Sequence, residues 1–259
     1  MPTVSIITIT YNAGPVLERT ARSIIAQETG DYEWLVIDGG STDDTLSLLN
    51  KYDSYVTRRL SEPDRGLYDA MNKGLRLARG RYVWFMNAGD EIHDPAVLPN
   101  LLDRIRAADL NRRGEPAADV YYSDALYVRA DGSPVGLRSV VTPHSLPRTL
   151  TWQDMALGMK VCHQAFVVRR SIAPAYDITN LSADLDWEIR CLKAAKRVEW
   201  LDFVLCKYLV GGVSVQRHRR SLLGRFRVLA HHFGWLPTLL NHLRIGWRAV
   251  SRSRSQTGN

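Results

Sequence analysis

Two acids that follow a run of apolar residues have the clearest chemical potential in this chain. Residues 83–86 form the run and predict a strand buried on both faces, and the turn after it carries Asp90 and Glu91. In an open α/β sheet, ligands bind outside the carboxyl ends of the strands. A carboxylate at that edge can hold a divalent cation, and the cation can hold a diphosphate. Asp90 could instead serve as a helix cap, because Asp94-Pro95 predicts a helix start close by.

Polar residues also follow two earlier strands of the chain. Thr10, Tyr11 and Asn12 end the first, and Asp38 opens the sequence Asp-Gly-Gly-Ser-Thr-Asp after the second. An aromatic ring can stack on a base, and a carboxylate can accept a base N–H. Asn-Ala-Gly and Asp-Gly-Gly are also ordinary ways to end a strand. Three such endings on neighbouring parallel strands would converge on one crevice, which favours a nucleotide site over turn chemistry alone.

Alternating strand and helix patterns would position these residues. The alternation predicts a doubly wound, largely parallel α/β sheet, and it breaks down after about residue 131. The pattern predicts strands at 4–10, 33–37, 56–60, 83–86 and 120–122, and helices at 16–27, 43–51, 67–78, 96–107, 184–195 and beyond Arg219.

Length and composition limit the classes of protein to which this chain can belong. A chain of 259 residues with 45% hydrophobic content suits one domain, with or without an appendage, and a sizeable core. Cys162, Cys191 and Cys206 show neither a CxxC pair nor metal-finger spacing, which indicates buried thiols in a reducing compartment. The first residues show no signal-peptide pattern and too few apolar residues to span a bilayer. We therefore expect a cytoplasmic protein.

The net charge of +7 is concentrated at the C-terminal end. From Phe203 onward the sequence contains no Asp or Glu, while Arg and His alternate there with Leu, Phe and Trp. Such a segment suits a helix lying on an anionic membrane surface, and we expect peripheral association with the inner face of the plasma membrane. A helix that packs its apolar side on the core is the alternative. Nucleic acid is not expected as a partner, since no recognised binding motif accompanies the charge.

Standard phosphate-binding loops are missing from the sequence. Residues 39–42 lack a following Gly-Lys-Ser/Thr, and no G-x-G-x-x-G follows the first strand. ATPase and dinucleotide dehydrogenase functions are therefore disfavoured.

Four motifs together resemble family 2 glycosyltransferases of the GT-A fold. The resemblance is to the branch that builds bacterial exopolysaccharides and surface glycolipids, including colanic-acid-type transferases. It is close over about the first 95 residues and recurs more sparsely at 162–164, 183–190 and 211–214. The four motifs are Ser-Ile-Ile-Thr-Ile-Thr-Tyr-Asn (5–12), Val-Ile-Asp-Gly-Gly-Ser-Thr-Asp (36–43), Asp-Arg-Gly-Leu-Tyr-Asp-Ala-Met-Asn-Lys-Gly (64–74) and Phe-Met-Asn-Ala-Gly-Asp (85–90).

The resemblance implies a GT-A type, Rossmann-like fold with a mostly parallel central sheet flanked by helices. The GT-A domain would span 1–218, with a nucleotide-binding half at about 1–95 and an acceptor-side half at about 118–218. Residues 219–259 would form a basic helical appendage. The implied activity is inverting, metal-dependent sugar transfer from a UDP, GDP or dTDP sugar to a hydroxyl of a lipid-linked saccharide or glycolipid in polysaccharide biosynthesis.

The resemblance also implies roles by position. Asn87-Ala-Gly-Asp90 stands where the family has an aspartate-rich metal motif, so Asp90 is expected to bind Mg²⁺ or Mn²⁺, with Glu91 in reserve. The residues expected to bind the nucleotide sugar are Thr10, Tyr11, Asn12, Asp38, Asp69, Asn72, Lys73 and Asn87.

The family's catalytic base is an aspartate at a helix start, with an arginine two turns later. Spacing back from Arg190 assigns the base to Asp184, with Asp186 as the rival. Either Ser182 or Asp184 could simply cap that helix. Further candidates for contact with the acceptor or diphosphate are His163, Gln164, Asp186, Arg217 and His218.

Two other functions stay open at this point. A sugar-nucleotide-binding protein without transferase activity is suggested by Asn87 and Gly89, which replace acids of the metal motif. A nucleotidyltransferase would share the sheet, but it would need a glycine-rich loop bearing Arg or Lys after the first strand. Residues 11–15 lack that charge.

Overall fold

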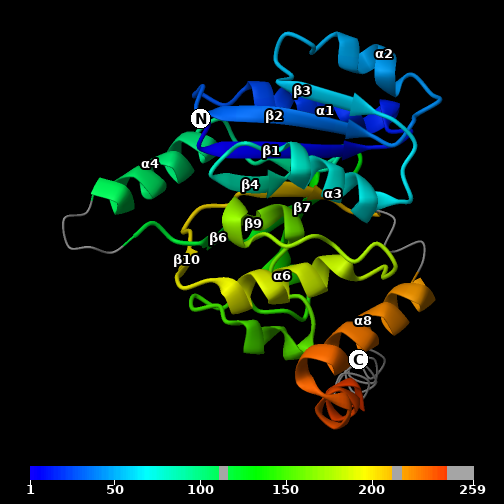
Figure 1. Ribbon diagram of the computed structural model, residues 1–259, viewed down its shortest axis with the longest axis vertical. Helices are drawn as coiled ribbons and strands as arrows, with labels where there is room; N and C mark the ends of the chain where they lie inside the picture. The colour runs from blue at the N-terminus through cyan, green and yellow to red at the C-terminus, as the bar shows by residue number, and fades with distance from the viewer. Residues whose placement is uncertain (111–115, 212–217, 244–259) are drawn as a thin grey trace, which may run out of the picture.

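The computed structural model describes residues 1–110, 116–211 and 218–243, and the side chains of 218–221 are not described (Figure 1). Strands and helices alternate through the first half, as the apolar pattern predicts. The first-half elements are β1 Val4–Thr10, α1 Gly14–Ile25, β2 Tyr32–Asp38, α2 Thr45–Asn50, β3 Arg58–Ser61, α3 Leu67–Leu77, β4 Tyr82–Phe85, β5 Glu91–Ile92 and α4 Val97–Leu110.

The second half is less regular. Short strands alternate there with 3₁₀ turns (η) and two long helices. Its elements are β6 Val120–Tyr122, β7 Ala125–Val128, β8 Pro134–Leu137, α5 Arg138–Val141, η1 Trp152–Leu157, η2 His163–Ala165, β9 Phe166–Arg169, η3 Arg170–Ile172, α6 Ala183–Ala194, β10 Val198–Trp200, β11 Cys206–Leu209 and α8 His218–Phe233, with helical backbone again at 235–243.

A seven-stranded sheet in the order β10-β6-β9-β4-β1-β2-β3 organises the fold. β1 pairs in parallel with both β2 and β4, so the three polar strand endings lie at one edge of the sheet. Every residue of β1 and β4 is buried, which explains the continuous apolar character of β4 and the large share of Val and Ile in β1. The expectation of a mostly parallel sheet flanked by helices is confirmed, and β9 is the strand that runs antiparallel to its neighbours.

Helix α3 packs against β1 and β2 at very close range. A Cβ atom added at Gly74 would lie 2.5 Å from a methyl carbon of Ile7, so the helix needs glycine at this point. Tyr68 to Gly74 are all buried. The candidate residues of this helix are therefore held rigidly against the sheet.

A smaller four-stranded sheet, in the order β5-β11-β7-β8, lies beyond the end of β4. β11 pairs antiparallel with β5 through Cys206 and Ile92. This pairing brings the backbone of Leu209 to the candidate acid Asp90. Thus a strand from the second half of the chain closes one side of the first-half edge.

Helix α8 packs against α6, as Figure 1 shows at the lower end of the molecule. Val228 and Leu229 are buried, and Phe233 stacks on Trp152 with ring centroids 5.3 Å apart. The described part of the C-terminal segment therefore combines core packing with an exposed side. No helix among the described residues is long and apolar enough to cross a membrane.

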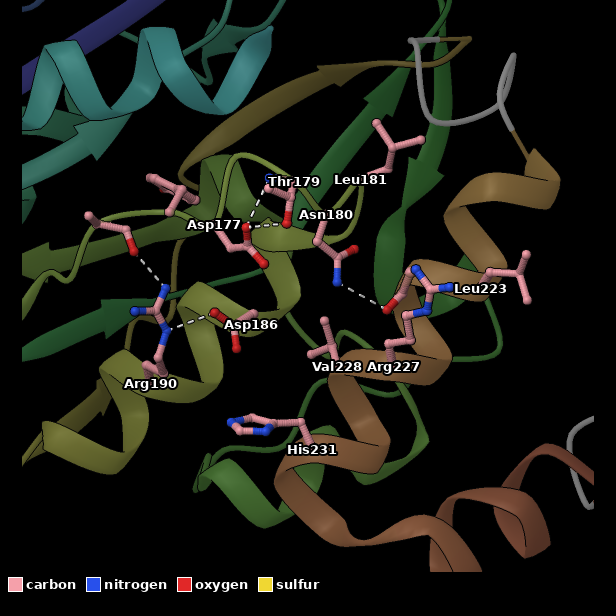
Figure 2. Close-up of a pocket in the computed structure, with 13 residues that line it drawn as sticks. Asp177, Thr179, Asn180, Leu181, Asp186, Arg190, Leu223, Arg227, Val228 and His231 are labelled. Carbon is pink, nitrogen blue, oxygen red and sulfur yellow. Dashed lines mark hydrogen bonds and ion pairs between the residues drawn. The ribbon is translucent and has the colours of Figure 1, made fainter. Parts of the chain in front are cut away.

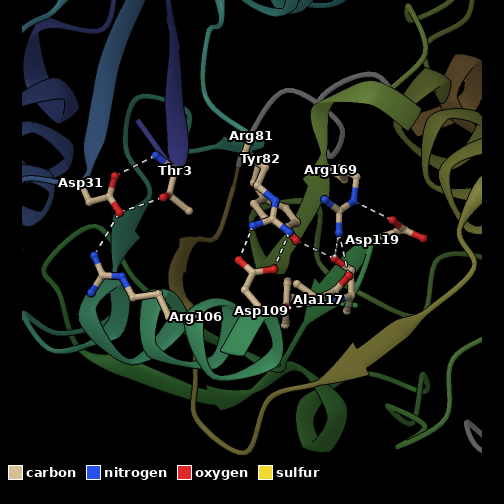
Figure 3. Close-up of polar contacts among 11 residues, drawn as sticks. Thr3, Asp31, Arg81, Tyr82, Arg106, Asp109, Ala117, Asp119 and Arg169 are labelled. Atoms are coloured by element: carbon tan, nitrogen blue, oxygen red, sulfur yellow. Dashed lines mark hydrogen bonds and ion pairs between the residues drawn. The ribbon is translucent and has the colours of Figure 1, made fainter. Parts of the chain in front are cut away.

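Ion pairs gather at the opposite edge of the main sheet, where the parallel strands begin (Figure 3). Arg169 contacts Asp119 at 2.6 Å, and Arg106 contacts Asp31 at 3.0 Å. Partly exposed pairs of this kind are each worth about 0–1 kcal/mol. These acids are tied to structural partners at the edge opposite the candidate site.

Candidate functional site

The turn after β2 is organised by Asp38, whose side chain is completely buried. One carboxylate oxygen accepts hydrogen bonds from the backbone N–H of Gly40 at 3.1 Å, from that of Ser41 at 3.0 Å and from the Ser61 hydroxyl at 2.7 Å. The other oxygen accepts the Ser41 hydroxyl. Asp38 thus shapes the loop that follows it, and a contact with a base stays a prediction.

Asn12 joins the turns after β1 and β2. Its backbone, at a positive φ of 47°, donates to the Ser41 hydroxyl at 2.8 Å, and its Oδ1 accepts the Thr42 N–H at 2.9 Å. Thr10 differs, because its buried hydroxyl has no hydrogen-bond partner among the described residues. An unpaired buried hydroxyl is costly, which makes this oxygen available for a ligand.

Tyr11 lies exposed above Gly39, with 63% of its surface accessible. A Cβ atom at Gly39 would lie 3.4 Å from the Tyr11 ring and 2.4 Å from Oδ2 of Asp64. A flat ring and a carboxylate therefore flank a position that only glycine fits. This arrangement can stack on a base and accept a base N–H. Asp64 was not singled out from the sequence, although its Pro-Asp-Arg-Gly turn follows β3 at the same edge of the sheet.

The acidic and basic residues of α3 hold the loop before that helix. Asp69 accepts the Arg65 backbone N–H at 3.1 Å and lies 3.3 Å from its guanidinium, and these contacts lower the pKa of the Asp69 carboxyl. Lys73 donates to the Pro63 carbonyl and to Glu62, each at 2.9 Å. Both residues stabilise the segment that carries Asp64, and a direct contact with the donor is untested.

Asp90 lies in a nearly dry position, with 5% of its surface exposed. Its Oδ1 accepts the backbone N–H of Leu209 at 2.9 Å. Burial raises the pKa of Asp90 to about 7, although the Leu209 N–H and the side chain of Gln164 oppose that rise. The carboxyl therefore gains or loses its proton near neutral pH, and a bound cation would favour the ionised form.

The two polar residues near Asp90, Asn87 and Glu91, differ in whether they already have a partner. Asn87 has a buried Oδ1 without a hydrogen-bond partner among the described residues. Glu91, the reserve candidate, instead pairs with Arg19 at 2.5 Å and lies 3.8 Å from Lys207. Within the described ranges, no group of three or more His, Cys, Asp or Glu could hold a metal ion. Asp90 and Asn87 each supply an oxygen at this turn, and a cation such as Mg²⁺, which commonly takes most of its ligands from substrate phosphate and water, would need few ligands from the protein.

His163 is enclosed by aromatic rings and faces an acid. Its Nε2 lies 3.0 Å from the Tyr176 hydroxyl, and its Nδ1 lies 3.4 Å from Oε1 of Glu188. Phe85 and Trp187 pack on the ring with centroids 5.4 and 5.2 Å away. Burial lowers the pKa of His163 to about 4, so the imidazole is neutral at physiological pH. It is not a cation poised for a diphosphate.

Glu188 was missed from the sequence, although it stands one turn after Asp184. Its side chain is fully buried, and neither oxygen has a hydrogen-bond partner among the described residues. Burial raises the pKa of Glu188 well above its ordinary value, and the charge of Asp184 adds to that rise. The i, i+4 spacing in a predicted helix was the available signal.

Gln164 and Asn72 fix the backbone around this cluster. The Gln164 side chain accepts from the Cys162 thiol at 3.2 Å, and its backbone carbonyl accepts the Trp84 indole N–H at 2.7 Å. Asn72 makes two hydrogen bonds with the backbone of Tyr176, at 3.0 and 2.7 Å. Asn72 therefore connects α3 to the segment before α6, and donor binding by its side chain is untested.

The two acids in the first turn of α6 have different surroundings. Asp184 is half-buried, its Oδ1 accepts the Leu185 N–H at 2.9 Å, and it lies near the Tyr68 hydroxyl. Burial raises the pKa of Tyr68 well above its usual value, and the Asp184 charge contributes. The Tyr68 hydroxyl donates to the Leu181 carbonyl at 3.1 Å. Asp184 therefore lies close to Tyr68 at the start of α3.

Asp186 is occupied by two cationic side chains. Its oxygens lie 2.7 Å from Nε of Arg190 and 2.7 Å from Nε2 of His232 on α8. Burial alone would raise the pKa of Asp186, but the His232 hydrogen bond and the Arg190 charge outweigh burial and hold it below its usual value. Asp186 serves as a link between α6 and α8.

Two sequence candidates cannot be placed in this site. Arg217 lies outside the described residues, as does most of the 211–217 segment around it. His218 begins α8, but its side chain is outside the described part of the chain.

Comparisons with known proteins identify a family from the sequence and a shared fold from solved structures. The family described as "Glycosyl transferase family 2" matches residues 5–171. The PGL/p-HBAD biosynthesis glycosyltransferase of Mycobacterium tuberculosis is 32% identical over 222 residues, covering 82% of this chain and 79% of that protein. Among solved structures, S. aureus TarS 1–349 in complex with UDP-GlcNAc has a TM-score of 0.68 at 17% identity, covering 91% of this chain and 72% of TarS. The mannosyltransferase PcManGT from Pyrobaculum calidifontis, in complex with GDP-Man and Mn²⁺, has a TM-score of 0.64 at 16% identity, covering 100% of this chain and 76% of that one.

Proposed function

The chain belongs to glycosyl transferase family 2, and from that premise we propose that it transfers a sugar from a nucleotide diphosphate sugar to a lipid-linked saccharide, with inversion. The observation that carries the proposal is the meeting of the β1, β2 and β4 endings at one edge of the sheet, with Asp184 of α6 close to Tyr68 of α3, the helix that packs on β1 and β2. The setting is bacterial surface-glycan biosynthesis, in agreement with the named mycobacterial relative and with the protein named "Putative teichuronic acid biosynthesis glycosyltransferase TuaG" of Bacillus subtilis, which is 36% identical over 94 residues, covering 35% of this chain and 37% of that protein.

The donor nucleotide is assigned to the edge formed by Tyr11, Gly39 and Asp64. The exposed ring can stack on the base, and the carboxylate can accept an N–H from it. The Thr10 hydroxyl, which has no hydrogen-bond partner among the described residues, lies at the end of β1, directly before Tyr11. TarS binds UDP-GlcNAc and PcManGT binds GDP-Man, which supports a nucleotide sugar as the ligand class without selecting the base.

Asp184 is the proposed general base. Inversion requires that the acceptor hydroxyl lose its proton while its oxygen attacks the anomeric carbon from the side opposite the leaving diphosphate. Asp184 is half-buried and lies close to Tyr68 of α3, whereas both oxygens of its rival Asp186 are held by Arg190 and His232. A base must have an oxygen free to accept the proton, and that requirement favours Asp184.

Asp90 and Asn87 are the proposed protein ligands of Mg²⁺ or Mn²⁺. A divalent cation at this corner would neutralise the charge that develops on the leaving diphosphate. Asp90 supplies an ionisable oxygen, and Asn87 supplies a buried oxygen without a partner among the described residues. PcManGT, which shares the fold, is described in complex with Mn²⁺.

Peripheral binding to an anionic membrane is proposed for the C-terminal helices. Large apolar side chains are exposed on α8 and on the helical stretch 235–243, which lie in a segment rich in arginine. Such a surface suits the interface of an anionic bilayer and would bring the enzyme to a lipid-linked acceptor. The exposed residues are Leu222, Leu223, Trp235, Leu236, Leu239, Leu240 and Leu243.

A donor screen tests the proposal. The melting temperature would be measured with UDP, GDP and dTDP sugars, each with Mn²⁺ and with chelator, and the positive donors would then be assayed for hydrolysis and transfer. We expect one nucleotide class to raise the melting temperature and to turn over with metal. Stabilisation without turnover on water or any acceptor would favour the second candidate, a sugar-nucleotide-binding protein, which the replacement of motif acids by Asn87 and Gly89 suggests. No stabilisation by any nucleotide sugar would contradict both.

A further inference from the structure

A cavity of about 900 Å³ lies between α6, α8 and the 175–181 segment that leads into α6 (Figure 2). None of the proposed donor, metal or base residues lines it. Its walls come from segments far apart in the sequence. The lining residues that matter here are Asp177, Asn180, Leu181, Leu223, Arg227 and His231.

A close backbone approach fixes the width of the cavity. Asn180 Nδ2 donates to the Gly224 carbonyl on α8 at 3.4 Å, and Asn180 Oδ1 accepts the Ser182 N–H at 2.9 Å. A Cβ atom at Gly224 would lie 2.4 Å from Asn180 Oδ1. A larger residue at 224 would displace the Asn180 side chain and break its hydrogen bond to the Gly224 carbonyl. The absence of a side chain at Gly224 therefore allows this contact between the two walls.

The charges of one wall are already compensated. Asp186 is held by Arg190 and His232, and Arg190 also donates to the Ala175 carbonyl at 2.6 Å. These groups hold the walls together and offer little to a ligand. The remaining polar groups decide what the cavity can bind.

Among the other polar groups that line the cavity, Asp177 offers hydrogen-bond acceptors on one side, and Arg227 and His231 of α8 offer donors on the other. Asp177 uses Oδ1 for the N–H and hydroxyl of Thr179, at 2.9 and 2.7 Å, which leaves Oδ2 for a ligand. Arg227 and His231 are exposed on α8, and neither forms an ion pair with a residue that the structure describes. Figure 2 shows both rising from α8, across the cavity from Asp177.

This mixture matches a saccharide better than other ligands. A sugar hydroxyl both donates and accepts hydrogen bonds, and a sugar ring also presents apolar C–H surface, which Leu181 and Leu223 at the rim can cover. A phosphate would meet the negative charge of Asp177. A lipid chain alone would leave Asp177 and Arg227 buried without partners.

The cavity also adjoins the proposed base. The carbonyl of Leu181 accepts the Tyr68 hydroxyl beside Asp184, while Leu181 itself lines the cavity. An acceptor whose terminal hydroxyl reached Asp184 would therefore continue past Leu181 into this space. We propose that the cavity between α6 and α8 binds the penultimate sugar of the acceptor, with Arg227 and Asp177 as its hydrogen-bonding residues. The inference rests on the proposed function and adds the acceptor's second sugar to it.

A comparison of short and long acceptors tests this subsite. Transfer would be measured to octyl glucoside, octyl galactoside and octyl mannoside, and to octyl maltoside, octyl lactoside and octyl mannobioside. Arg227→Ala would be compared with Arg225→Ala, a change on the same helix at a residue that does not line the cavity. Acceptor-free hydrolysis of the donor would be recorded for every variant.

Wild-type enzyme and Arg225→Ala should show a lower KM for a disaccharide than for its monosaccharide counterpart. Arg227→Ala should raise the disaccharide KM about tenfold, as expected for the loss of one charge-assisted hydrogen bond, with kcat and donor hydrolysis unchanged. Asp177→Asn should shift the same ratio in the same direction. Equal KM values for both acceptor lengths in the wild type, an unchanged ratio in Arg227→Ala, or no use of any glycoside would overturn the subsite. If the wild-type enzyme hydrolysed no donor at all, that result would instead contradict the proposed function.

Discussion

The edge formed by β1, β2 and β4 and the wall formed by α6 and α8 use their polar residues in different ways. At the edge, most polar side chains stabilise the turns themselves, as Asp38 and Asn12 do, and only a few groups such as the Tyr11 ring stay free. On the α6 wall, two acids of a single turn have different partners, because Asp186 is paired with Arg190 and His232, whereas Asp184 forms no ion pair with a residue that the structure describes. In the proposed function, the rigid edge of the sheet would hold the donor, and the acid without a cationic partner among the described residues, Asp184, would activate the acceptor.

Asp184→Asn should have the largest effect. We expect transfer to fall by at least about 10³-fold, because a general base contributes about 10²–10⁴ and an amide cannot accept the proton. Nucleotide affinity and melting temperature should change little. Rate measurement and nucleotide titration on the same preparation provide the check.

Asp186→Asn is the matched control on the same helix. It should weaken the contacts with Arg190 and His232 and lower the free energy of unfolding by about 1–3 kcal/mol. Turnover per folded molecule should be preserved. If Asp186→Asn stopped transfer and Asp184→Asn did not, the two acids would have to exchange roles.

Asp90→Asn tests the edge. The amide keeps an oxygen for the Leu209 N–H but cannot ionise, so metal-dependent turnover should drop at least about tenfold. In the wild type, metal affinity should fall as pH falls below about 7, because the proton then competes for Asp90. Calorimetric titration with Mn²⁺ across pH 6–8 measures this, and unaltered metal dependence in the variant would remove Asp90 from the site.

The same substitution makes a stability prediction. The folded-state pKa of Asp90 is raised, so its stabilising contribution is present at low pH and is lost as pH rises through about 7. Without metal, Asp90→Asn should therefore be more stable than the wild type at pH 8, and the difference should shrink on acidification and vanish below the ordinary Asp pKa of about 4. A variant that was less stable at pH 8 would contradict the burial of an ionisable carboxyl there.

Vesicle binding tests the proposed membrane role of the exposed apolar residues on the C-terminal helices. Trp235→Glu with Leu236→Glu should reduce co-sedimentation with phosphatidylglycerol vesicles several-fold, whereas Tyr55→Glu, at an exposed aromatic residue elsewhere, should not. Point variants are preferable to a cut after Ser221, because the cut would also remove buried Leu229 and the Asp186 partner His232. Equal binding by all proteins would exclude the membrane role.

Glu188→Gln should have the smallest effect. Because burial raises the pKa of Glu188, the folded state favours its neutral form, and its stabilising contribution is lost as pH rises through that raised pKa. A neutral amide of similar shape should therefore be as stable as the wild type or about 1–2 °C more stable at pH 8. Thermal unfolding measures the shift, with exposed Glu18→Gln as the control. A marked loss of stability would show that the Glu188 carboxylate is needed in its ionised form.

The sequence predicted the elements of the edge more fully than the roles of their residues. The strand at 120–122 was predicted with its observed bounds, and the adjacency of the three strand endings was confirmed. Apolar periodicity reports burial, and burial determines these strands. It carries no information on hydrogen-bond partners, so the attachment of Asn72 to the Tyr176 backbone, 104 residues away, could not be inferred.

On the α6 wall, the sequence predicted Asp184 as the base over its rival Asp186 from family spacing alone, and it could not show how the surroundings of the two acids differ. The difference depends on His232, 46 residues further along the chain, and on how α8 docks. Asp64 escaped notice for a similar reason, because its approach to Gly39 exists only after β2 and β3 pair. Local patterns predicted which residue types would gather, and tertiary packing determined which of them remain available.

The anomeric configuration of the first product tests the central claim most directly. The reaction of an α-linked nucleotide sugar identified by the donor screen would be followed by proton NMR from the first turnover, in wild type and in Asp184→Asn. The account predicts a β-linked product from the wild type and no product signal above background from Asp184→Asn. An α-linked product, or a β-linked product formed at the wild-type rate by Asp184→Asn, would contradict it.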